Sequence, residues 1–598
     1  MLGIILLSLS LVTTTLACTT LAVGKKATRD GSVMAAHSAD GNGVTDPRLV
    51  RIPGNSYAPN SRRAVFASPE LYPRYVGDDP RSPSGEVPAY LPENCQAGET
   101  NCDVWEPIGY IPQVEQTFSY MEAVYGVMNE HQVGIAESTC SAVFSARPVH
   151  QGGRALLSIN ALSQIAMERA TTSREAVSIM GALAEEFGFY GASDSFEGGA
   201  ESLMVTDPSE AWSFHILAGP DVAYDSKLGD KAEFKSGAVW VAARVCDECV
   251  TVTANMFSIR EVNLNDPANF LGTSNMWQIA EEHGFWRPGE PMDFTATFSD
   301  GEYAHKYYSG RRMWGVYRLL APEAGLSPDY GNLKEDRPYP FQAPVSGPVK
   351  DKTGGVAPED IFAVMRDYYN ETRFSLGAPS TGGGPWGSVD RMGYNDPNSK
   401  IQVSGNWERS IGLWRTAESY IVQSGGSVAG PVKAANATIP GGVVHFGAQS
   451  ALYTVYVPIF GGGTIELPAP LVSGWQGVYD LTTNFWAART VAFTAQVKWS
   501  YIIQDVQAMQ RRLEAESQKL IASLFSGTSA DIVSTMAKNS QKAVEESLAL
   551  FHTSLFKYAD GYINQWRGDT FTSSTINYPG YWLRTTDYKW GPPPVQEE

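Results

Sequence analysis

Short apolar and alternating segments, separated by turns, occupy much of the first half of this chain of 598 residues. Alternation of apolar and polar positions, or a short continuous apolar run, is typical of strands rather than helices. Strands are predicted at residues 19–23, 33–36, 133–138, 202–206, 211–217, 238–245 and 250–254. The first two are joined by a turn-rich connector, so they are expected to form a hairpin.

Two helices are predicted between those strands. Residues 159–169 and 172–187 carry apolar side chains at helical spacing. Thr172 and Glu175 have the spacing of a capping box, which marks the start of the second helix. Hairpins, then two helices, then further strands predict a layered α+β protein with a largely antiparallel sheet.

The remaining segments differ in composition. Residues 46–115 and 285–400 are rich in proline and glycine, and we interpret them as long surface insertions. From about Val491 the pattern changes to amphipathic helices, at residues 504–525 and 530–558. Their apolar stripes are expected to pack on the core of the protein.

The chain begins with an apolar run. Residues 1–17 end in Thr15-Leu16-Ala17, and small residues at positions −3 and −1 are what a signal peptidase requires. Cleavage after Ala17 would make Cys18 the first residue of the mature chain. Two other interpretations of Cys18 stay open. One is chance placement after a cleavage site, and the other is a lipid-anchor site, which Thr15 disfavours because that position is usually aliphatic.

A cysteine at a mature N-terminus combines two reactive groups. Its thiol and its free α-amine lie within a few ångströms of each other. The amine has a reference pKa near ~8, so it can take the thiol proton at neutral pH without a second residue as general base.

The charge of the chain argues against two classes of partner. The formal net charge is −19, whereas binding of nucleic acid or of anionic membranes requires clustered lysine and arginine. After residue 17, no apolar run approaches the ~20 residues of a membrane-spanning helix. We therefore expect neither nucleic acid nor a membrane span, and homo-oligomerisation stays open.

Four of the six cysteines form two close pairs. Cys95 and Cys102 flank a short polar loop, and Cys246 and Cys249 form a C-x-x-C motif, so an exported chain would carry two local disulfides. No second C-x-x-C and no histidine pair at ligand spacing accompanies the motif, so we predict no metal and no cofactor. The cysteines left free are Cys18 and Cys140.

A specific signature follows Cys18, whereas the signatures of serine hydrolases, P-loop proteins and zinc peptidases are missing. Residues 18–41 combine C-T-T, V-G-K and D-G-S with a closing Asp40. This segment resembles the start of the N-terminal-nucleophile cysteine dipeptidases, the family that includes dipeptidase A and the secernins. Further segments that resemble this family are residues 126–138, 167–170, 201–207, 254–255 and 410–416.

The resemblance implies the four-layer αββα fold of the N-terminal-nucleophile (Ntn) hydrolases, with loop insertions. It also implies hydrolysis of the amide bond of small peptides through a thioester on Cys18. The chain would then consist of a signal peptide (1–17), a catalytic domain (18–490) and a helical C-terminal region (491–598).

Five residues in or near these segments are candidates for supporting roles. Asn129 and Asn255 each lie beside an apolar strand, and their amides are suited to bind the oxyanion of a tetrahedral intermediate. Asp40 would hold the α-amine or a neighbouring cation, and Arg415 would supply a supporting charge. His37 stands where related enzymes often have arginine, and its imidazole is expected to change charge within the working pH range.

Two other functions are compatible with the sequence. Relatives with the Ntn fold include penicillin and bile-salt amidases and acid ceramidase, so the substrate could be an N-acyl amide. The other alternative is a non-catalytic secreted scaffold or binding protein. The leader and two sequons, at Asn370 and Asn436, favour the secretory pathway: the extracellular space, a lysosomal or vacuolar lumen, or a periplasm.

Overall fold

The computed structural model describes most of the chain from Cys18 onward. The described residues are 18–41, 47–66, 107–192, 199–222, 237–300, 306–328, 339–377, 383–389, 408–433, 438–473, 479–528, 530–559, 562–567, 570–576 and 578–585. The predicted signal peptide, the predicted Cys95–Cys102 disulfide and the sequon at Asn436 lie outside them. As predicted, the described part is an α+β protein whose two large sheets are antiparallel.

The first large sheet has seven strands in the order β16-β14-β1-β2-β17-β20-β21. They are β1 (Thr19–Val23), β2 (Ser32–Asp40), β14 (Cys249–Thr253), β16 (Gln342–Pro344), β17 (Thr416–Gly425), β20 (Val443–Ala448) and β21 (Val457–Phe460). β1 lies inside the sheet, between β2 and β14, and every residue of these three strands is buried. This two-sided burial explains the nearly continuous apolar runs in the sequence.

The second large sheet has eight strands in the order β15-β13-β12-β11-β8-β7-β6-β3. They are β3 (Val50–Ile52), β6 (Tyr120–Glu122), β7 (Gly126–Asn129), β8 (Gly134–Cys140), β11 (Ala200–Thr206), β12 (Ala211–Ala218), β13 (Ala238–Val245) and β15 (Phe270–Gly272). The two sheets face each other, because β8 contacts β1, β2 and β17 of the first sheet.

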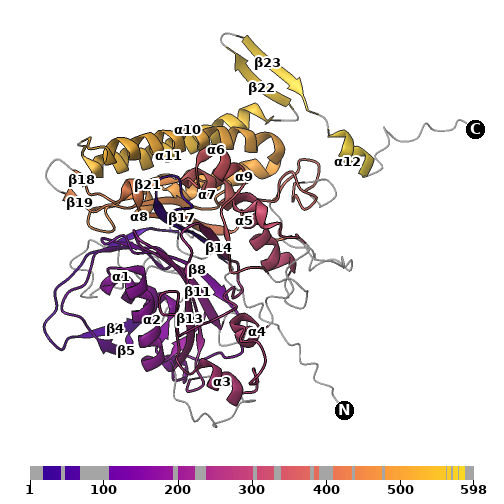
Figure 1. Ribbon diagram of the computed structural model, residues 1–598. Coiled ribbons are helices and arrows are strands. Elements are labelled where there is room, and N and C mark those ends of the chain that lie inside the picture. The colour runs from indigo at the N-terminus through magenta and orange to yellow at the C-terminus, as the bar shows by residue number, and fades with distance from the viewer. Residues whose placement is uncertain are drawn as a thin grey trace, which may run out of the picture.

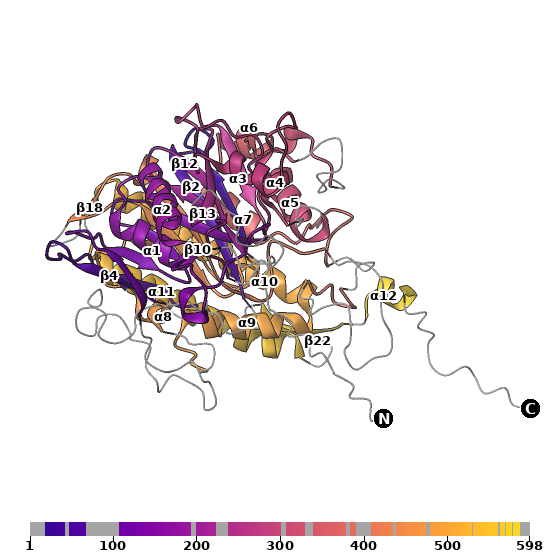
Figure 2. The same cartoon turned by 90° about the horizontal axis from the view of Figure 1, so that it is seen from below.

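Helices pack on both sheets. α1 (Ile159–Arg169) contacts β6 and β7, and α2 (Ser173–Phe187) contacts β11, β12 and β13. Figure 1 shows these two helices on the opposite side of the molecule from α10 (Trp499–Phe525) and α11 (Ile532–Lys557). The helices that cover the first sheet are α5 (Arg311–Leu320), α7 (Pro358–Met365), α9 (Asn484–Val497), α10 and α11. Figure 2 shows α9, α10 and α11 grouped on one side.

Smaller elements complete the described chain. Pairs of short strands are β4 (Arg62–Phe66) with β5 (Pro107–Pro112), β9 (Leu157–Ser158) with β10 (Phe189–Tyr190), β18 (Val432–Lys433) with β19 (Thr438–Ile439), and β22 (Tyr562–Arg567) with β23 (Thr570–Thr575). Short helices are α3 (Met276–Glu282), α4 (Phe294–Phe298), α6 (Pro348–Thr353), α8 (Ala469–Val472) and α12 (Gly580–Thr585). No helix among the described residues is long and apolar enough to cross a membrane.

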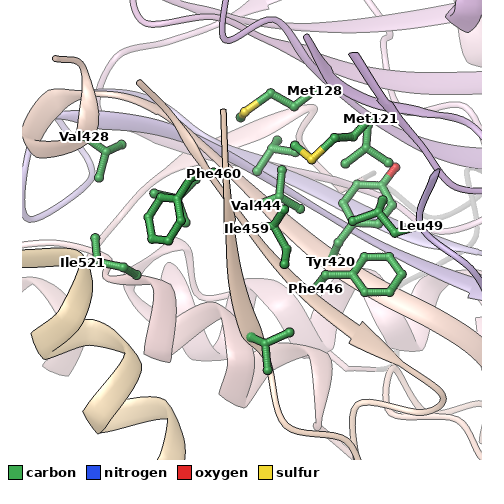
Figure 3. Close-up of a cluster of buried hydrophobic side chains, with 14 of the residues drawn as sticks. Leu49, Met121, Met128, Tyr420, Val428, Val444, Phe446, Ile459, Phe460 and Ile521 are labelled. Carbon is green, nitrogen blue, oxygen red and sulfur yellow. The ribbon is translucent and has the colours of Figure 1, made fainter. Parts of the chain in front are cut away.

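The predicted C-terminal helices are confirmed as α10 and α11, and they share a hydrophobic cluster with the sheets. In Figure 3, Met121 and Met128 of the second sheet lie near Tyr420 and Val444 of the first, with Ile521 of α10 in the same cluster. The segment 285–400 is only partly a surface insertion. Its helices α5 and α7 carry buried apolar residues that pack under β1, β2 and β14.

One of the two hydrogen bonds of the predicted capping box of α2 is present. The Thr172 side chain accepts a hydrogen bond from the Glu175 N–H at 3.2 Å, as expected for an N-cap. The Glu175 carboxylate binds back one residue earlier than predicted, accepting from the N–H and the hydroxyl of Thr171, both at 2.8 Å. The helix therefore starts where the sequence indicates.

One ion pair ties α10 to the first sheet. Arg366, at the end of α7, donates two hydrogen bonds to the carboxylate of Glu514, at 2.9 and 2.5 Å. The same carboxylate accepts the Tyr456 N–H at 3.0 Å. The side chains of Arg366 and Glu514 are only 15% and 5% exposed, so the pair is shielded from water.

Glu514→Ala should therefore lower the free energy of unfolding by about 3 kcal/mol or more, because it leaves a buried guanidinium without its counter-charge. The matched control is Glu516→Ala on the same helix. Glu516 also forms an ion pair, with Lys542, but is 46% exposed, so its loss should cost less than about 1 kcal/mol. Urea unfolding of both variants measures the difference, and equal losses would contradict this account.

Among the described residues, three histidines are fully buried in the sheets: His37 in β2, His215 in β12 and His445 in β20. Burial lowers the pKa of His37 to about 4, and it lowers the pKa values of His215 and His445 to about 3. An unfolded histidine titrates near ~6.5. Between these values the unfolded state binds protons that the folded state does not, so stability falls as the pH falls.

His445→Gln tests this linkage. At pH above ~6.5 the contribution of His445 to stability is fully present, and it is lost as the pH falls toward its folded pKa. The variant should reduce the slope of unfolding free energy against pH by about 1.4 kcal/mol per pH unit between pH ~6 and pH ~4. Urea unfolding at a series of pH values measures the slope. An unchanged slope would show that His445 is not buried as a neutral group.

Candidate active site

Cys18 stands immediately before β1 and is 1% exposed. The strand that follows it is held on both sides. Thr19 pairs with Ser38 of β2, and Thr20 pairs with Thr253 of β14. The Thr19 N–H also donates to the Ser38 hydroxyl at 3.2 Å. The backbone at Cys18 is therefore fixed by two neighbouring strands.

Arg312 of α5 binds the Cys18 backbone directly. Its Nη1 donates to the Cys18 carbonyl at 2.7 Å and to Thr19 Oγ1 at 2.9 Å. Its Nη2 donates to the Ala254 carbonyl at 3.1 Å and to Asn255 Oδ1 at 2.7 Å. Burial lowers the pKa of Arg312 to about 9, so the guanidinium is still charged at neutral pH.

Asn255, a predicted site residue, follows β14, and Arg312 links its side chain to the Cys18 carbonyl. Its Nδ2 donates to the Thr139 carbonyl at 2.7 Å, and its N–H donates to Ser138 Oγ at 2.9 Å. Ser138 in turn donates to the Cys18 carbonyl at 3.2 Å. The backbone of Asn255 has φ of 57°, in the left-handed region that asparagine tolerates better than most residues.

Asn129, the other predicted oxyanion donor, is placed differently. Its Nδ2 donates to the carbonyls of Met167 and Ala170 at the end of α1, at 3.0 and 2.8 Å. Its Oδ1 accepts from the N–H groups of His131 and Val133. Both amide hydrogens therefore bind carbonyls at the end of a helix, and Asn129 connects α1 to the β7–β8 turn. No amide hydrogen is left to bind an oxyanion, so the predicted role is wrong.

Asp40, the last residue of β2, holds a cation as predicted, although the partner is a residue that the sequence did not indicate. Arg409 donates to Asp40 Oδ2 at 2.5 Å, and Thr416 donates to Oδ1 at 2.5 Å. Arg409 and Arg415 both interact electrostatically with Asp40 and Cys18. Burial and the nearby Arg409 lower the pKa of Arg415, which is less buried than Arg409.

His37 is beside Cys18, but its predicted change of charge is wrong. Its pKa of about 4 keeps the imidazole neutral at working pH. Nδ1 lies 2.8 Å from the Glu137 carbonyl oxygen and 3.3 Å from the Glu137 backbone nitrogen. The shorter contact favours the tautomer with the proton on Nδ1, because two lone pairs would repel at that distance. The ring contacts Tyr420 and Tyr125, with centroids 5.1 and 5.7 Å away. Nε2 is buried and has no hydrogen-bond partner among the described residues.

The carboxylate of Glu137 in β8 lies beside Cys18 and His37. Its Oε1 accepts from Thr139 Oγ1 at 2.9 Å, and the carboxylate also interacts with Glu201, Cys18 and Tyr125. Burial raises the pKa of Glu137. Burial, and then the negative charges of Glu137 and Asp40, raise the pKa of the Cys18 thiol. Ligand-type atoms of Cys18, His37 and Glu137 all lie within 4.8 Å of one another.

Three site residues were missed by sequence reasoning. Glu137 lies in the segment 126–138 and Arg409 directly precedes the segment 410–416, so inspection of charged residues at those segments would have found them. Arg312 had no such signal. It lies within the proline- and glycine-rich stretch that the sequence assigns to the surface, 294 residues from Cys18.

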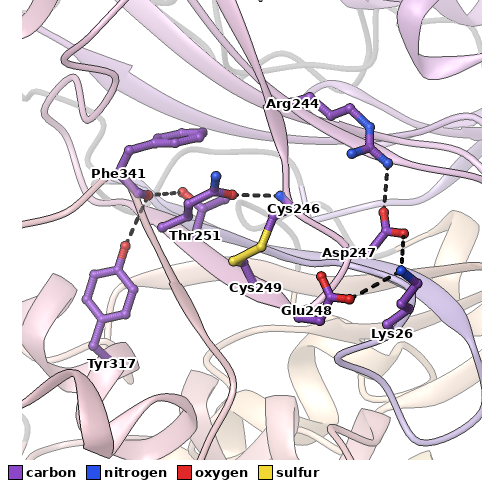
Figure 4. Close-up of a disulfide and its surroundings, with 10 residues drawn as sticks. Lys26, Arg244, Cys246, Asp247, Glu248, Cys249, Thr251, Tyr317 and Phe341 are labelled. Carbon is purple, nitrogen blue, oxygen red and sulfur yellow. Dashed lines mark hydrogen bonds and ion pairs between the residues drawn. A yellow bond between two sulfur atoms is a disulfide. The ribbon is translucent and has the colours of Figure 1, made fainter. Parts of the chain in front are cut away.

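The predicted Cys246–Cys249 disulfide is present, with the two Cα atoms 5.1 Å apart, and neither Cys18 nor Cys140 forms a disulfide. Figure 4 shows it at the turn between β13 and β14, beside Lys26 and its partners Asp247 and Glu248. The Gly24 N–H donates to the Cys249 carbonyl, and a Cβ at Gly24 would lie 2.3 Å from the Cys246 carbonyl oxygen. The disulfide turn therefore packs against the end of β1 that is remote from Cys18.

Comparison with known proteins found a matching family and several relatives. The sequence profile of peptidase family C69 matches residues 17–512. A probable dipeptidase of Latilactobacillus sakei is 23% identical over 450 residues, which are 74% of each chain. A probable dipeptidase A of Streptococcus pyogenes is 21% identical over 554 residues, 90% of this chain and 95% of the relative. A dipeptidase of Bifidobacterium longum is 25% identical over 380 residues, 60% of each chain.

The family match covers most of the chain, from the residue before Cys18 to the middle of α10. The chain therefore belongs to peptidase family C69 and is a cysteine-type peptidase, as the resemblance of residues 18–41 predicts.

Proposed function

We propose that this protein is an Ntn dipeptidase, which hydrolyses the amide bond of small peptides through a thioester on Cys18. The observation that carries the proposal is the place of Cys18. Its thiol is buried at the head of an inner strand, and Arg312 holds its carbonyl. The relatives named as dipeptidases support the substrate class. Two facing sheets with helices packed on each support the four-layer αββα assignment.

The mature chain is proposed to begin at Cys18. In the folded chain, burial and two carboxylates raise the pKa of the thiol, so the thiol keeps its proton at neutral pH until a base removes it. The free α-amine of Cys18 would be that base. The thiolate then attacks the peptide carbonyl, and the protonated amine gives its proton to the leaving amine. Water, activated by the same amine, hydrolyses the thioester and restores the thiol.

Asn255 is the proposed donor to the oxyanion. One of its two amide hydrogens binds the Thr139 carbonyl, and the other would bind the oxygen of the tetrahedral intermediate. Arg312 accepts no proton in this scheme. It binds Asn255 Oδ1, and this hydrogen bond fixes the orientation of the Asn255 amide, including its NH2 group. Arg415, which interacts with Asp40 and is less buried than Arg312 and Arg409, would meet the carboxylate of the peptide.

Export is a further part of the proposal. It rests on the leader at residues 1–17 and on the sequon at Asn370. Asn370 is exposed, and its neighbours Tyr369 and Glu371 both have positive φ, so the sequon lies in a sharp surface turn. An oligosaccharyltransferase can reach such a turn in a eukaryotic secretory pathway.

Intact-mass analysis of the protein produced in a host that processes leaders should show a chain that starts at an unmodified Cys18. Cys18→Ala should abolish dipeptide hydrolysis without loss of folding, and Cys18→Ser should keep at most a trace. The control is Cys140→Ala, which removes a second buried cysteine that forms no disulfide in the described part of the chain and should leave turnover intact. Undiminished turnover in Cys18→Ala would overturn the assignment, and turnover of N-acyl amides alone would favour the amidase alternative.

Two asparagines provide a second test. Asn255→Ala should lower kcat by about 10²–10³, the usual loss for one oxyanion donor, with KM little changed. Asn129→Ala should instead lower the free energy of unfolding, by about 1–3 kcal/mol, because two buried carbonyls lose their donor. Its kcat should be close to wild type. The reverse pattern, with kcat lost in Asn129→Ala only, would contradict the assignment of Asn255.

A further inference from the structure

The side chains of Cys18, His37 and Glu137 form a cluster, and the proposed reaction uses only the first of them. The thiol of Cys18, the imidazole of His37 and the carboxylate of Glu137 come from the start of β1, from β2 and from β8, and all are buried. Their ligand-type atoms lie within 4.8 Å of one another. The amine base and the oxyanion donor proposed above account for neither His37 nor Glu137.

One of these groups has a buried atom without a partner. His37 Nε2 makes no hydrogen bond with any described residue. The buried carboxylate of Glu137 interacts with Glu201, Cys18 and Tyr125. Buried polar atoms without partners are rare in native proteins, and each costs free energy unless water or a ligand satisfies it. With its proton on Nδ1, His37 keeps a lone pair on Nε2. A cation that accepts lone pairs would satisfy Nε2.

The donor types narrow the choice of cation. Thiolate, neutral imidazole and carboxylate together are typical ligands of Zn²⁺, which binds them at about 2.0–2.3 Å in tetrahedral geometry. Ligand atoms around zinc are then about 3.5 Å apart. Since the ligand atoms lie within 4.8 Å of one another, the largest separation would have to close by at most about 1.3 Å, which small side-chain rotations can supply.

We propose that Cys18, His37 and Glu137 form an inhibitory Zn²⁺ site in the mature enzyme. The proposal rests on the proposed function in one respect: a free α-amine at Cys18 would be the fourth ligand. The amine and thiol of an N-terminal cysteine close a five-membered ring around a metal ion. The site would then have one sulfur, two nitrogens and one oxygen as ligands.

The surroundings of His37 favour this role. A metal-binding histidine commonly donates its other ring N–H to a carbonyl or carboxylate, which fixes the tautomer and the orientation of the ring. The His37 Nδ1–H donates to the backbone carbonyl of Glu137 in this way. One ligand residue therefore orients the other, while Tyr125 and Tyr420 restrict rotation of the ring.

Zinc in this site would block the reaction at two points. It would occupy the lone pairs of the sulfur, so the nucleophile could not attack, and those of the amine, so no base would remain. Binding replaces the thiol proton, which is released to solvent, so the affinity for zinc should rise with pH. Removal of the metal by a chelator should restore activity.

The test uses the mature full-length enzyme, stripped of metal, and titrates it with Co²⁺ as a spectroscopic probe and then with Zn²⁺. We expect one equivalent of Co²⁺, a thiolate-to-cobalt charge-transfer band in the near ultraviolet, and displacement of cobalt by zinc. Zinc should also protect Cys18 from alkylation. His37→Gln and Glu137→Gln should each weaken zinc binding at least tenfold, and Cys18→Ser should abolish the band.

Two controls separate this site from chance binding. His445→Gln removes another fully buried histidine whose Nδ1 lacks a hydrogen-bond partner among the described residues, and it should leave zinc affinity unchanged. Cys140→Ser should likewise keep the charge-transfer band. Absence of the band in the wild-type enzyme would overturn the proposal. Equal zinc affinity in wild type, His37→Gln and Glu137→Gln would also overturn it, because the thiol would then bind the metal alone.

Dipeptide turnover, measured on the same preparations with a chelator present, distinguishes this inference from the proposed function. Turnover without metal binding would remove the zinc site and leave the dipeptidase assignment intact. Metal binding that depends on His37 and Glu137, in a preparation without turnover, would support the zinc site and contradict the dipeptidase assignment.

Discussion

The arrangement around Cys18 depends on one buried guanidinium, that of Arg312. It bonds to the carbonyl of Cys18 and the hydroxyl of Thr19 at the start of β1, and to the carbonyl of Ala254 and the amide of Asn255 at the end of β14. A planar group with donors in fixed directions can hold four acceptors at once, which an ammonium group cannot do. Helix α5 thus sets the relative position of two strand ends.

The electrostatics of the site keep the thiol neutral in the absence of substrate. Burial and the carboxylates of Glu137 and Asp40 raise the pKa of Cys18, and Arg409 opposes only part of that effect through its pair with Asp40. This differs from peptidases in which a neighbouring imidazolium keeps the cysteine ionised. Here His37 is neutral and unable to do so. A base that is part of the nucleophilic residue itself fits this environment, because the buried thiol keeps its proton until a nearby base removes it.

Local elements could be predicted from the sequence because their signals are local. Residues 19–23 and 159–169 occur as β1 and α1 with the predicted bounds. The direction in which a side chain points could not be predicted from such local signals. Asn129 and Asn255 both follow apolar strands, yet one is turned to the end of α1 and the other to Cys18. The neutral state of His37 also depends on burial by segments far away in the sequence, which no pattern around residue 37 encodes.

The place of β1 in its sheet has a consequence for how the protein must be made. Because Cys18 is 1% exposed and begins a strand flanked on both sides, any residues in front of it start from a buried point. An enzyme of the proposed type requires cleavage directly before Cys18. Cleavage one residue early would place an extra peptide unit between amine and thiol, and cleavage one residue late would remove the thiol. The fidelity of the processing protease would therefore decide what fraction of the folded molecules is active.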